Sequence, residues 1–195
     1  MTDVPKITEW IVADLEADSK SGSPQIIDCP YGKAVSFNGK NDAYFINANP
    51  LTGLSSFTAE IIFKPLPGGE FEQRFLHMGE STGARMLFEL RLNDNGTWYL
   101  DTFLNSGDNG LALIDENLIH PAGGWYHAAI VYENGIMKHY VNKVLELTGE
   151  IDFPAMPEGK TSLGARQNEI SWFKGELYKI KITDRVLEPD HFLNF

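Results

Sequence analysis

Polar and aromatic side chains recur at alternate positions in three segments of the sequence. Apolar residues fill the positions between them, which is the pattern of strands with one face on a core and the other face outward. Carboxylates and guanidinium groups can exchange hydrogen bonds with sugar hydroxyls, and an aromatic ring can cover the apolar face of a pyranose. A concave sheet carrying these side chains would form a sugar-binding groove. The residues predicted to line it are Glu60, Glu89, Arg91, Tyr99, Asp101 and Phe103.

The same outward faces also have a simpler interpretation, as a solvated surface with cross-strand charge pairs. Such pairs stabilise a sheet by only about 0.2–1 kcal/mol each. In either interpretation these side chains lie outside the core. Replacing Arg91 or Asp101 with alanine is therefore expected to leave the fold intact, and to weaken binding only if the groove is real.

Catalysis is the second hypothesis for these residues. The sequence contains no P-loop, no dinucleotide-binding fingerprint, no G-x-S-x-G elbow and no H-E-x-x-H motif. A polysaccharide lyase or glycoside hydrolase would draw a general acid or base from this set of side chains or from His127. The candidates are Glu60, Glu89, Tyr99, Asp101 and His127. No catalytic residue is assigned, and binding without catalysis is favoured.

Three histidines could hold a ligand or a metal. His127 is in phase with an apolar set in its segment, so it is expected to be a hydrogen-bonded histidine within the core. His77 and His139 have no partner visible in the sequence. A zinc site is therefore not expected, and no metal ligand is assigned. The apolar residues in phase with His127 are Trp125, Ala129 and Val131.

Two strands joined by a tight turn are predicted between Gly123 and Leu147. Residues 125–132 are all aromatic, β-branched, His or Ala, which is typical of a strand. Asn134-Gly135 follows, and both residues tolerate the positive φ angles of a primed hairpin turn. Residues 136–147 form the predicted return strand, with a second turn at Asn142-Lys143.

Alternation and turn residues predict further strands along the chain, many of them at spacings near the ~8–12 residues typical of sandwiches. A last helical turn is expected at 188–190. Residues 7–17 could also form a helix with Ile7, Trp10, Ile11 and Leu15 on one face, but an edge strand that pairs with the last strand is favoured. The expected strands lie within 7–17, 26–37, 43–46, 57–64, 75–78, 86–92, 98–104, 111–114, 162–166 and 172–183. The residues expected in the buried layer between two sheets are Phe57, Ile61, Leu90, Leu100, Trp125, Ala129 and Val131.

Four motifs follow one another in a recognisable order: AVSFNG at 34–39, SFTAE at 56–60, W-x-H before the Asn-Gly hairpin, and a run from SLGAR to DRVL at 162–187. Together they resemble the laminin-G-like branch of the concanavalin A-like lectin/glucanase superfamily, over residues 34–192. The resemblance implies an all-β, antiparallel two-sheet β-sandwich of the jelly-roll type. Residues 1–195 are expected to form one such domain. The fold hosts lectins, hydrolases, lyases and adhesion modules, so it does not decide the function.

The sequence departs from the family at two functional places. The glucanase branch carries a Glu-x-Asp-x-x-Glu arrangement on one strand, which this sequence lacks. Laminin-G-like domains often bind calcium through an Asp on the last strand, and Tyr178 stands at that position. Glu176 and the backbone around Asn38-Gly39 could substitute. No cofactor is expected, and weak calcium binding stays open.

Composition limits the partners and the compartment. A formal charge of −11 argues against nucleic acid and against an anionic membrane surface. Cys29 is the only cysteine, so no intrachain disulfide can form. The first ten residues lack the pattern of a signal peptide, so the chain is expected in the cytoplasm, or secreted or periplasmic if a leader preceded this sequence. The oligomeric state stays open.

The function favoured by the sequence is a carbohydrate-binding, lectin-like module that recognises an oligo- or polysaccharide. The alternatives are a polysaccharide lyase or glycoside hydrolase of the same fold, and a protein–protein adhesion module that uses loops at the edge of the sandwich. The sequence does not name the glycan. If no glycan binds, the long loop at 105–123 is the next candidate site.

Overall fold

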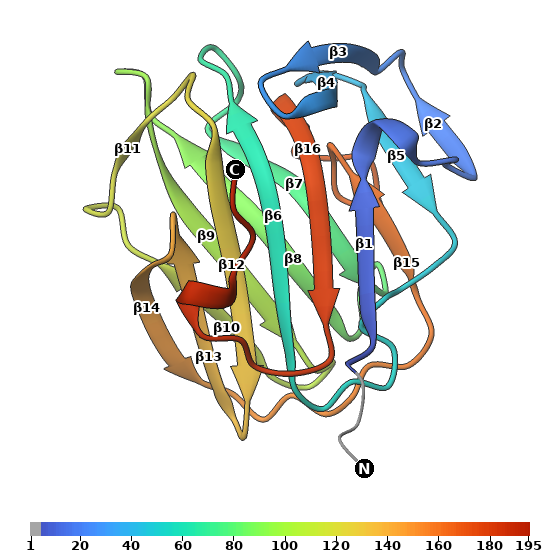
Figure 1. Cartoon of the computed structure of the whole chain (residues 1–195), viewed down its shortest axis with the longest axis vertical. Coiled ribbons are helices and arrows are strands. Elements are labelled where there is room, and N and C mark those ends of the chain that lie inside the picture. Colours follow the sequence, from blue (N-terminus) through green and yellow to red (C-terminus); the bar gives the residue numbers. More distant parts are fainter. Residues whose placement is uncertain (1–4) are drawn as a thin grey trace.

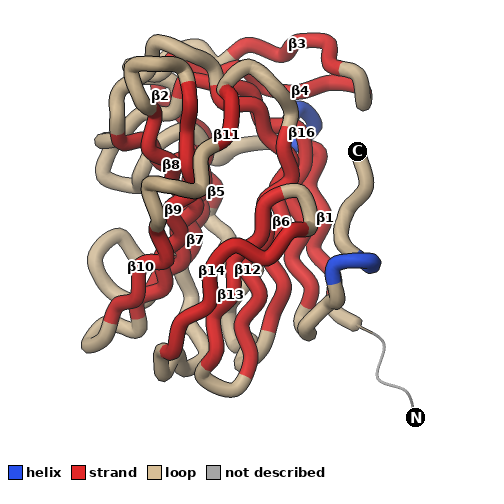
Figure 2. Tube along the Cα trace, turned by 90° about the vertical axis from the view of Figure 1, so that its left-hand side faces the viewer, coloured by secondary structure: helices blue, strands red, loops and turns tan. Residues whose placement is uncertain are grey.

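The chain folds into two antiparallel sheets that pack face to face, as a computed structural model shows for residues 5–195 (Figures 1 and 2). The fold is nearly all β, and its helices are two short 3₁₀ turns, η1 (Val12–Asp14) and η2 (Pro189–His191). This arrangement confirms the predicted jelly-roll sandwich. Neither turn of the described chain has the length or the apolar character of a helix that crosses a membrane.

The first sheet, here sheet A, contains eight strands. In spatial order it consists of β14 (Val144–Glu150), β13 (Ile136–Val141), β12 (Tyr126–Glu133), β6 (Phe57–Pro65), β16 (Lys174–Thr183), β4 (Gly32–Asn38) and β3 (Gln25–Cys29), and β1 (Ile7–Ile11) also pairs with β16. The pairing of β1 with β16 confirms the expectation that the first segment is an edge strand beside the last one.

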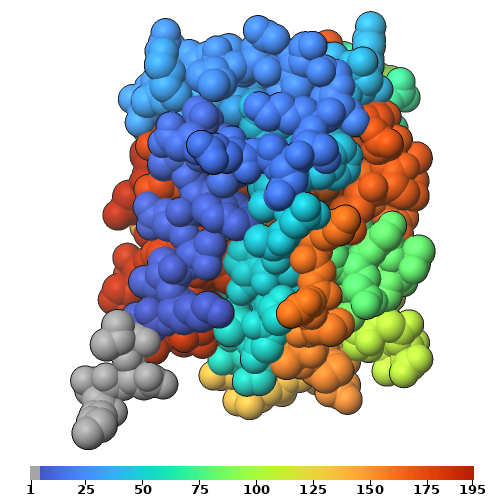
Figure 3. All heavy atoms as spheres, turned by 90° about the vertical axis from the view of Figure 1, so that its right-hand side faces the viewer, coloured from blue at the N-terminus to red at the C-terminus, as the bar shows by residue number. Residues whose placement is uncertain are grey.

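The second sheet, sheet B, also has eight strands. Its order is β10 (Gly110–Ile114), β9 (Thr97–Asn105), β8 (Arg85–Leu92), β7 (Glu72–Gly79), β15 (Lys160–Leu163), β5 (Ala43–Ile46) and β2 (Ser19–Ser21), and β11 (His120–Pro121) pairs with β9. Figure 3 shows the side of the molecule where residues near 50 (cyan) lie beside residues near 155 (orange). Thr52 and Met156 form an isolated β-bridge.

In each sheet, one late strand joins the strands that come first in the chain to the middle strands: β16 in sheet A and β15 in sheet B. In sheet A, β16 lies between β6 on one side and β4 and β1 on the other. In sheet B, β15 lies between β7 and β5. The strands that come first in the chain, β1 to β5, therefore meet the middle strands of their sheets only through β15 and β16.

The hairpin turns follow the local chemistry of the sequence. Asn134 and Gly135 have φ angles of 51° and 82°, and Asn142 and Lys143 have 49° and 69°. Positive φ at both central residues is the mark of a type I′ turn, whose twist matches that of the strands. The predicted turns between β12, β13 and β14 are confirmed. Lys143 has this positive φ angle although it is not a glycine, and residues with a side chain rarely adopt such an angle.

The core between the sheets contains four of the seven predicted residues: Phe57, Ile61, Leu90 and Leu100. The prediction for β12 is wrong by one position. Tyr126, Ala128, Ile130 and Tyr132 face the other sheet. Ala129 and Val131 belong instead to a second cluster on the outer face of sheet A, and Trp125 is only partly buried, edge-on to Tyr31.

The reason for this error is that both faces of β12 are covered. Phe192, Val186 and Leu187 of the C-terminal segment pack on the outer face, against Ala129, Val131 and Tyr140. Figure 2 shows this segment with η2 outside sheet A. When both alternating sets of a strand are apolar, hydrophobicity alone cannot tell which set faces the other sheet.

Leu90 lies between the sheets and Trp125 does not, so truncation of these two large side chains should have different effects on stability. Leu90→Ala should lower the free energy of unfolding by about 2–5 kcal/mol, because it opens a cavity between the sheets. Trp125→Ala should cost much less, because its ring lies outside that layer. Urea denaturation of both variants measures the difference. Equal losses in the two variants would contradict the assignment of Trp125.

Candidate functional site

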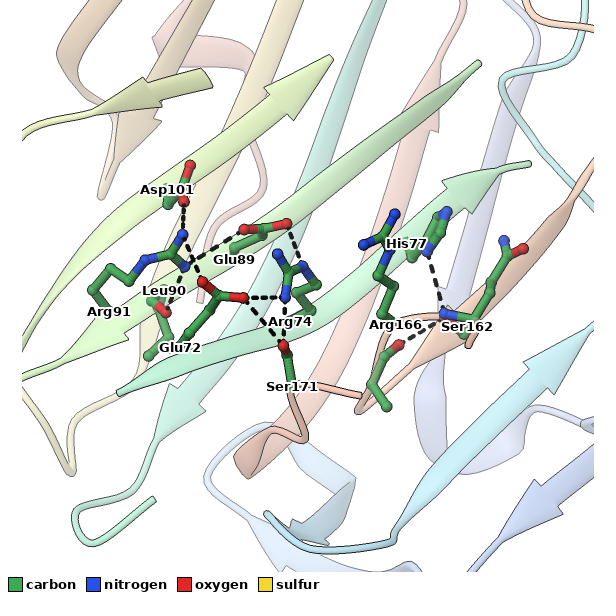
Figure 4. A network of polar contacts seen from close by, with 12 residues as sticks. Glu72, Arg74, His77, Glu89, Leu90, Arg91, Asp101, Ser162, Arg166 and Ser171 are labelled. Atoms are coloured by element: carbon green, nitrogen blue, oxygen red, sulfur yellow. Dashed lines mark hydrogen bonds and ion pairs between the residues drawn. The ribbon is translucent and has the colours of Figure 1, made fainter. Parts of the chain in front are cut away.

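The outer face of sheet B carries a connected network of charged side chains from β7, β8 and β9 (Figure 4). Strand register places Asp101 directly opposite Glu89, and Glu89 directly opposite Arg74. Arg91 Nη2 lies 2.6 Å from Asp101 Oδ2, and Arg74 Nε lies 2.6 Å from Glu89 Oε1. Arg91 Nη1 is also 3.5 Å from Glu89 Oε2, so the two arginines hold both carboxylates.

One end of the network reaches the surface at Glu72. Its carboxylate accepts hydrogen bonds from Arg74 and from Ser171, and its Oε2 lies 3.4 Å from Arg91 Nη2. Burial alone would raise the pKa of Glu72, but the hydrogen bond and charge of Arg74 outweigh it and lower that pKa. Glu72 therefore remains ionised and ties the loop that contains Ser171 to the strands.

The other two carboxylates of the network, those of Glu89 and Asp101, are buried. The side chains of Glu89 and Asp101 are only 4% and 5% exposed, and that of Arg91 is 13% exposed. The interpretation of this face as a solvated surface is therefore wrong. Burial also argues against the expectation that Arg91 or Asp101 can be truncated without affecting the fold. Burial, with the nearby charge of Glu89, raises the pKa of Asp101 to about 7 against the opposing effect of Arg91.

A pocket of about 250 Å³ opens above this network. Four guanidinium groups line it, those of Arg74, Arg85, Arg91 and Arg166, together with Glu89, Asp101 and Phe103. The guanidinium of Arg85 lies over the ring of Phe103, 5.2 Å from its centroid. The pocket therefore combines hydrogen-bond donors in fixed orientations with buried acceptors and an aromatic wall.

The structure brings together four of the six predicted groove residues: Glu89, Arg91, Asp101 and Phe103. Tyr99 lies on the same strand as Asp101 and pairs in register with Arg91, but it is buried and does not line the pocket. Glu60 is on the other sheet. Alternation along a strand shows which side chains share its faces, but it does not show to which sheet the strand belongs.

Glu60 instead holds the C-terminal segment on the outer face of sheet A. Its Oε1 lies 3.1 Å from His127 Nε2 and accepts a hydrogen bond from the backbone N–H of Leu193. Lys181 Nζ is 3.7 Å from Oε2. His127 is fully buried and hydrogen-bonded as expected, but it lies beneath Phe192 on this outer face and not between the sheets.

The other two histidines also have protein partners. His77 Nε2 pairs with the carbonyl of Glu80, and burial together with Arg166 and Arg85 lowers the pKa of His77 to about 4. His139 Nδ1 is 2.9 Å from the hydroxyl of Thr102. Within residues 5–195, no three His, Cys, Asp or Glu side chains come together as a metal site requires.

At the position where the family carries a calcium-binding Asp, the side chains of this chain have protein partners. The hydroxyl of Tyr178 donates to the carbonyl of Tyr31, and Glu176 pairs with Lys64 at 3.4 Å. The nearby carboxylate of Asp42 accepts from the backbone N–H groups of Ser23 and Asn38. At most weak calcium binding remains our prediction, since calcium needs six or more oxygen ligands.

Three arginines of the pocket were not predicted: Arg74, Arg85 and Arg166. A register shift in β7 after Arg74 breaks the alternation that would have placed Arg74 on the outer face. Arg166 follows β15 in a loop, where no periodicity applies. The scarcity of arginine was the one signal available from the sequence, which contains only five. The structure shows that four of the five line this pocket.

Comparisons with known structures agree with the fold. Domain 4 of AbnA, a GH43 extracellular arabinanase from Geobacillus stearothermophilus, in complex with arabinotriose, matches with a TM-score of 0.66 and 20% identity over 95% of this chain and 84% of that one. A heptameric SAP-like pentraxin from Limulus polyphemus matches with a TM-score of 0.60 and 18% identity over 80% and 77% of the two chains. At these identities the likeness concerns the fold alone.

The binding domain of botulinum neurotoxin serotype D is also similar, with a TM-score of 0.64 and 14% identity. The match covers 95% of this chain but only 45% of that domain. No curated protein sequence matches the chain. The family model described as the concanavalin A-like lectin/glucanases superfamily matches residues 38–191. The match includes most of the chain, which therefore belongs to the concanavalin A-like lectin/glucanases superfamily.

Proposed function

We propose that this protein is a non-catalytic carbohydrate-binding module that holds an oligosaccharide in the pocket on the outer face of sheet B. The observation that carries the proposal is the pocket itself, where four arginines converge beside an aromatic wall and two buried carboxylates. Guanidinium groups donate to sugar hydroxyls in a fixed fork, and Phe103 offers an apolar face to a ring. The network beneath holds these groups in place before a ligand arrives, which reduces the entropic cost of binding.

A second hollow of about 640 Å³ extends the candidate surface. It is lined by Phe45 of β5, by Lys160 of β15 and by Gln167, the residue next to Arg166 in the chain. Gln167 is fixed by hydrogen bonds from its side-chain amide to the carbonyls of Gly79 and Lys160. Residues of the β7–β8 turn line this second hollow, and Arg85, which follows the turn, lines the first, so an oligosaccharide longer than one sugar could use both.

The similar structures support a binding role without identifying the ligand. The matched arabinanase domain is described in complex with arabinotriose. The matched neurotoxin domain is described as a binding domain. Arabinotriose is therefore one reasonable first probe for this chain, among a wider set of glycans.

One observation favours a glycoside hydrolase as the second candidate. Glu89 and Asp101 face each other across two strands, and burial raises the pKa of Asp101 to about 7, near the value that suits a general acid. Against this candidate, both carboxylates are almost fully buried and are paired with Arg91. Direct contact with a glycosidic oxygen would require this pairing to open.

A glycan array followed by calorimetry tests the proposal. We expect the parent to bind one class of oligosaccharide, and Phe103→Ala to weaken that binding by roughly tenfold through the loss of one aromatic contact. Phe195→Ala is the matched control, because that ring contacts Tyr31 far from the pocket. Reducing-sugar and unsaturated-product assays on the bound glycans should show no release.

Three results would contradict the proposal. Product release would favour the hydrolase or lyase. Equal affinity of Phe103→Ala and the parent would move the site away from the pocket. Failure to bind any glycan would turn attention to protein partners and to the segment between β9 and β12, which includes β10 and β11.

A further inference from the structure

The arginines of this chain are concentrated at one place. Four of the five in the sequence line the pocket on sheet B, although the whole chain carries a formal charge of −11. Lysine, which is more than twice as frequent in the sequence, does not line the pocket. The positive charges that line the pocket are therefore all planar guanidinium groups, with no lysine ammonium group among them.

Two of these arginines have carboxylate partners, and two do not. Arg74 and Arg91 pair with Glu72, Glu89 and Asp101. Arg85 donates only to the carbonyls of Thr82 and Gly83, at 2.9 and 2.7 Å, and Arg166 donates to the carbonyl of Ser81 at 3.2 Å. Within residues 5–195 neither Arg85 nor Arg166 forms an ion pair, and the Nε atom of each is buried without a hydrogen-bond partner.

The charges of Arg85 and Arg166 act on one another and on their neighbours. Burial, followed by the charge of Arg166, lowers the pKa of Arg85. The low pKa of His77 has the same origin, since burial acts there together with Arg166 and Arg85. His77 is therefore neutral near pH 7 and adds no charge. The charge of Glu89 acts in the opposite direction on the pKa of Arg85, but burial and Arg166 outweigh it. Within residues 5–195, Arg85 and Arg166 are therefore the two pocket arginines that form no ion pair.

Resting on the proposed carbohydrate-binding function, we propose that the sugar bound in this pocket carries an anionic substituent, a carboxylate or a sulfate. Arg85 and Arg166 hold this group, while Arg74 and Arg91 remain with the carboxylates of the network. A guanidinium presents two parallel N–H donors that match the oxygens of such a group. Phe103 keeps the plane of Arg85 fixed by stacking beneath it.

This proposal explains why the pocket retains two unpaired cations. A neutral sugar would leave both guanidinium groups partly desolvated and without a counter-charge, which costs free energy. An anionic group would accept charge-assisted hydrogen bonds from both and remove their mutual repulsion. The pocket should therefore discriminate by charge among sugars of the same shape.

The experiment compares charged glycans with their neutral counterparts by isothermal titration calorimetry. The probes are trigalacturonate and its methyl ester, a sulfated galactan oligosaccharide without carboxylates and its desulfated form, and arabinotriose. We expect at least one charged probe to bind roughly ten- to a hundredfold more tightly than its neutral counterpart. The carboxylate and sulfate arms show which anion the pocket accepts.

Variants connect this preference to the two arginines. Arg85→Gln and Arg166→Gln should each remove most of the difference between a charged probe and its neutral counterpart. Arg85→Lys and Arg166→Lys keep the charge but lose the fork, so they should retain only part of it. Arg185→Gln, outside the pocket, should bind as the parent does. Melting temperatures of the Gln variants should fall only slightly, because each variant loses hydrogen bonds to carbonyls of the β7–β8 turn but breaks no ion pair.

The outcomes separate this inference from the proposed function. If neutral probes bind as tightly as charged ones, the inference is wrong and the carbohydrate-binding function stands. If a charge preference persists in both Gln variants, the anion is held elsewhere and the inference is also wrong. If none of the five probes binds, the result counts against both proposals.

Discussion

Glu60→Ala should lower the free energy of unfolding by about 3–5 kcal/mol, although Glu60 carries the type of side chain expected in a ligand site. The substitution removes the buried acceptor shared by His127 and the N–H of Leu193. It also leaves His127 without that partner at a fully buried position. The C-terminal segment should then detach more readily, exposing Ala129, Val131 and Tyr140. Urea denaturation measures the loss, and limited proteolysis should show earlier cleavage near Phe192.

Glu9→Ala is the matched control on the same sheet. Its carboxylate pairs with Lys179 at 2.7 Å, but its side chain is 46% exposed, so its loss should cost at most about 1 kcal/mol. Glycan binding by Glu60→Ala should resemble that of the parent under conditions where the variant is folded. If Glu60→Ala were as stable as Glu9→Ala and bound no glycan, Glu60 would belong to a binding site after all.

Arg91→Ala is the second substitution with a large expected effect, a loss of about 3–5 kcal/mol in the free energy of unfolding. It removes the partner of Asp101 and one of the two partners of Glu89 while both carboxylates stay buried. The loss should depend on pH. Because the folded-state pKa of Asp101 is raised to about 7, above its usual 3.8, ionisation of this group costs stability as pH rises from near 4 to about 7, and its contribution is constant at higher pH.

The charge of Arg91 opposes the rise in the pKa of Asp101, so removing Arg91 raises that pKa further. The variant should therefore be less destabilised at about pH 5 than at about pH 8. Chemical denaturation at the two pH values measures this difference. Lys33→Ala serves as the control, because its pair with Asp28 is exposed and should contribute close to nothing at either pH. A loss for Arg91→Ala as small as that of Lys33→Ala would show that Glu89 and Asp101 do not need Arg91 as a partner in the folded state.

Local features of the sequence were enough to predict the hairpins and the phases of several strands. Asn134-Gly135 predicts its turn because the required φ angles are a property of those two residues. The phases of β6, β8 and β9 were predictable because only one alternating set in each strand is strongly apolar. These strands placed Phe57, Ile61, Leu90 and Leu100 correctly in the core.

The errors arise where the answer depends on distant parts of the chain. The phase of β12 depends on the covering C-terminal segment, and the position of Glu60 depends on which sheet contains β6. The pocket depends on a register shift after Arg74 and on a loop that returns Arg166 to the face of sheet B. None of these features has a periodic signal in the residues themselves.

The positions of β15 and β16 also determine when the fold can be completed during synthesis. Sheets A and B each remain in two separate parts until these strands have left the ribosome, because β1 to β5 have no other connection to the middle strands within their sheets. The first strands must wait while most of the chain is made, with their hydrogen-bonding edges open. Pairings across such long sequence separations form slowly. An incomplete chain that stops before β15 would therefore expose strand edges on both sheets, and it should be a target for chaperones or proteases.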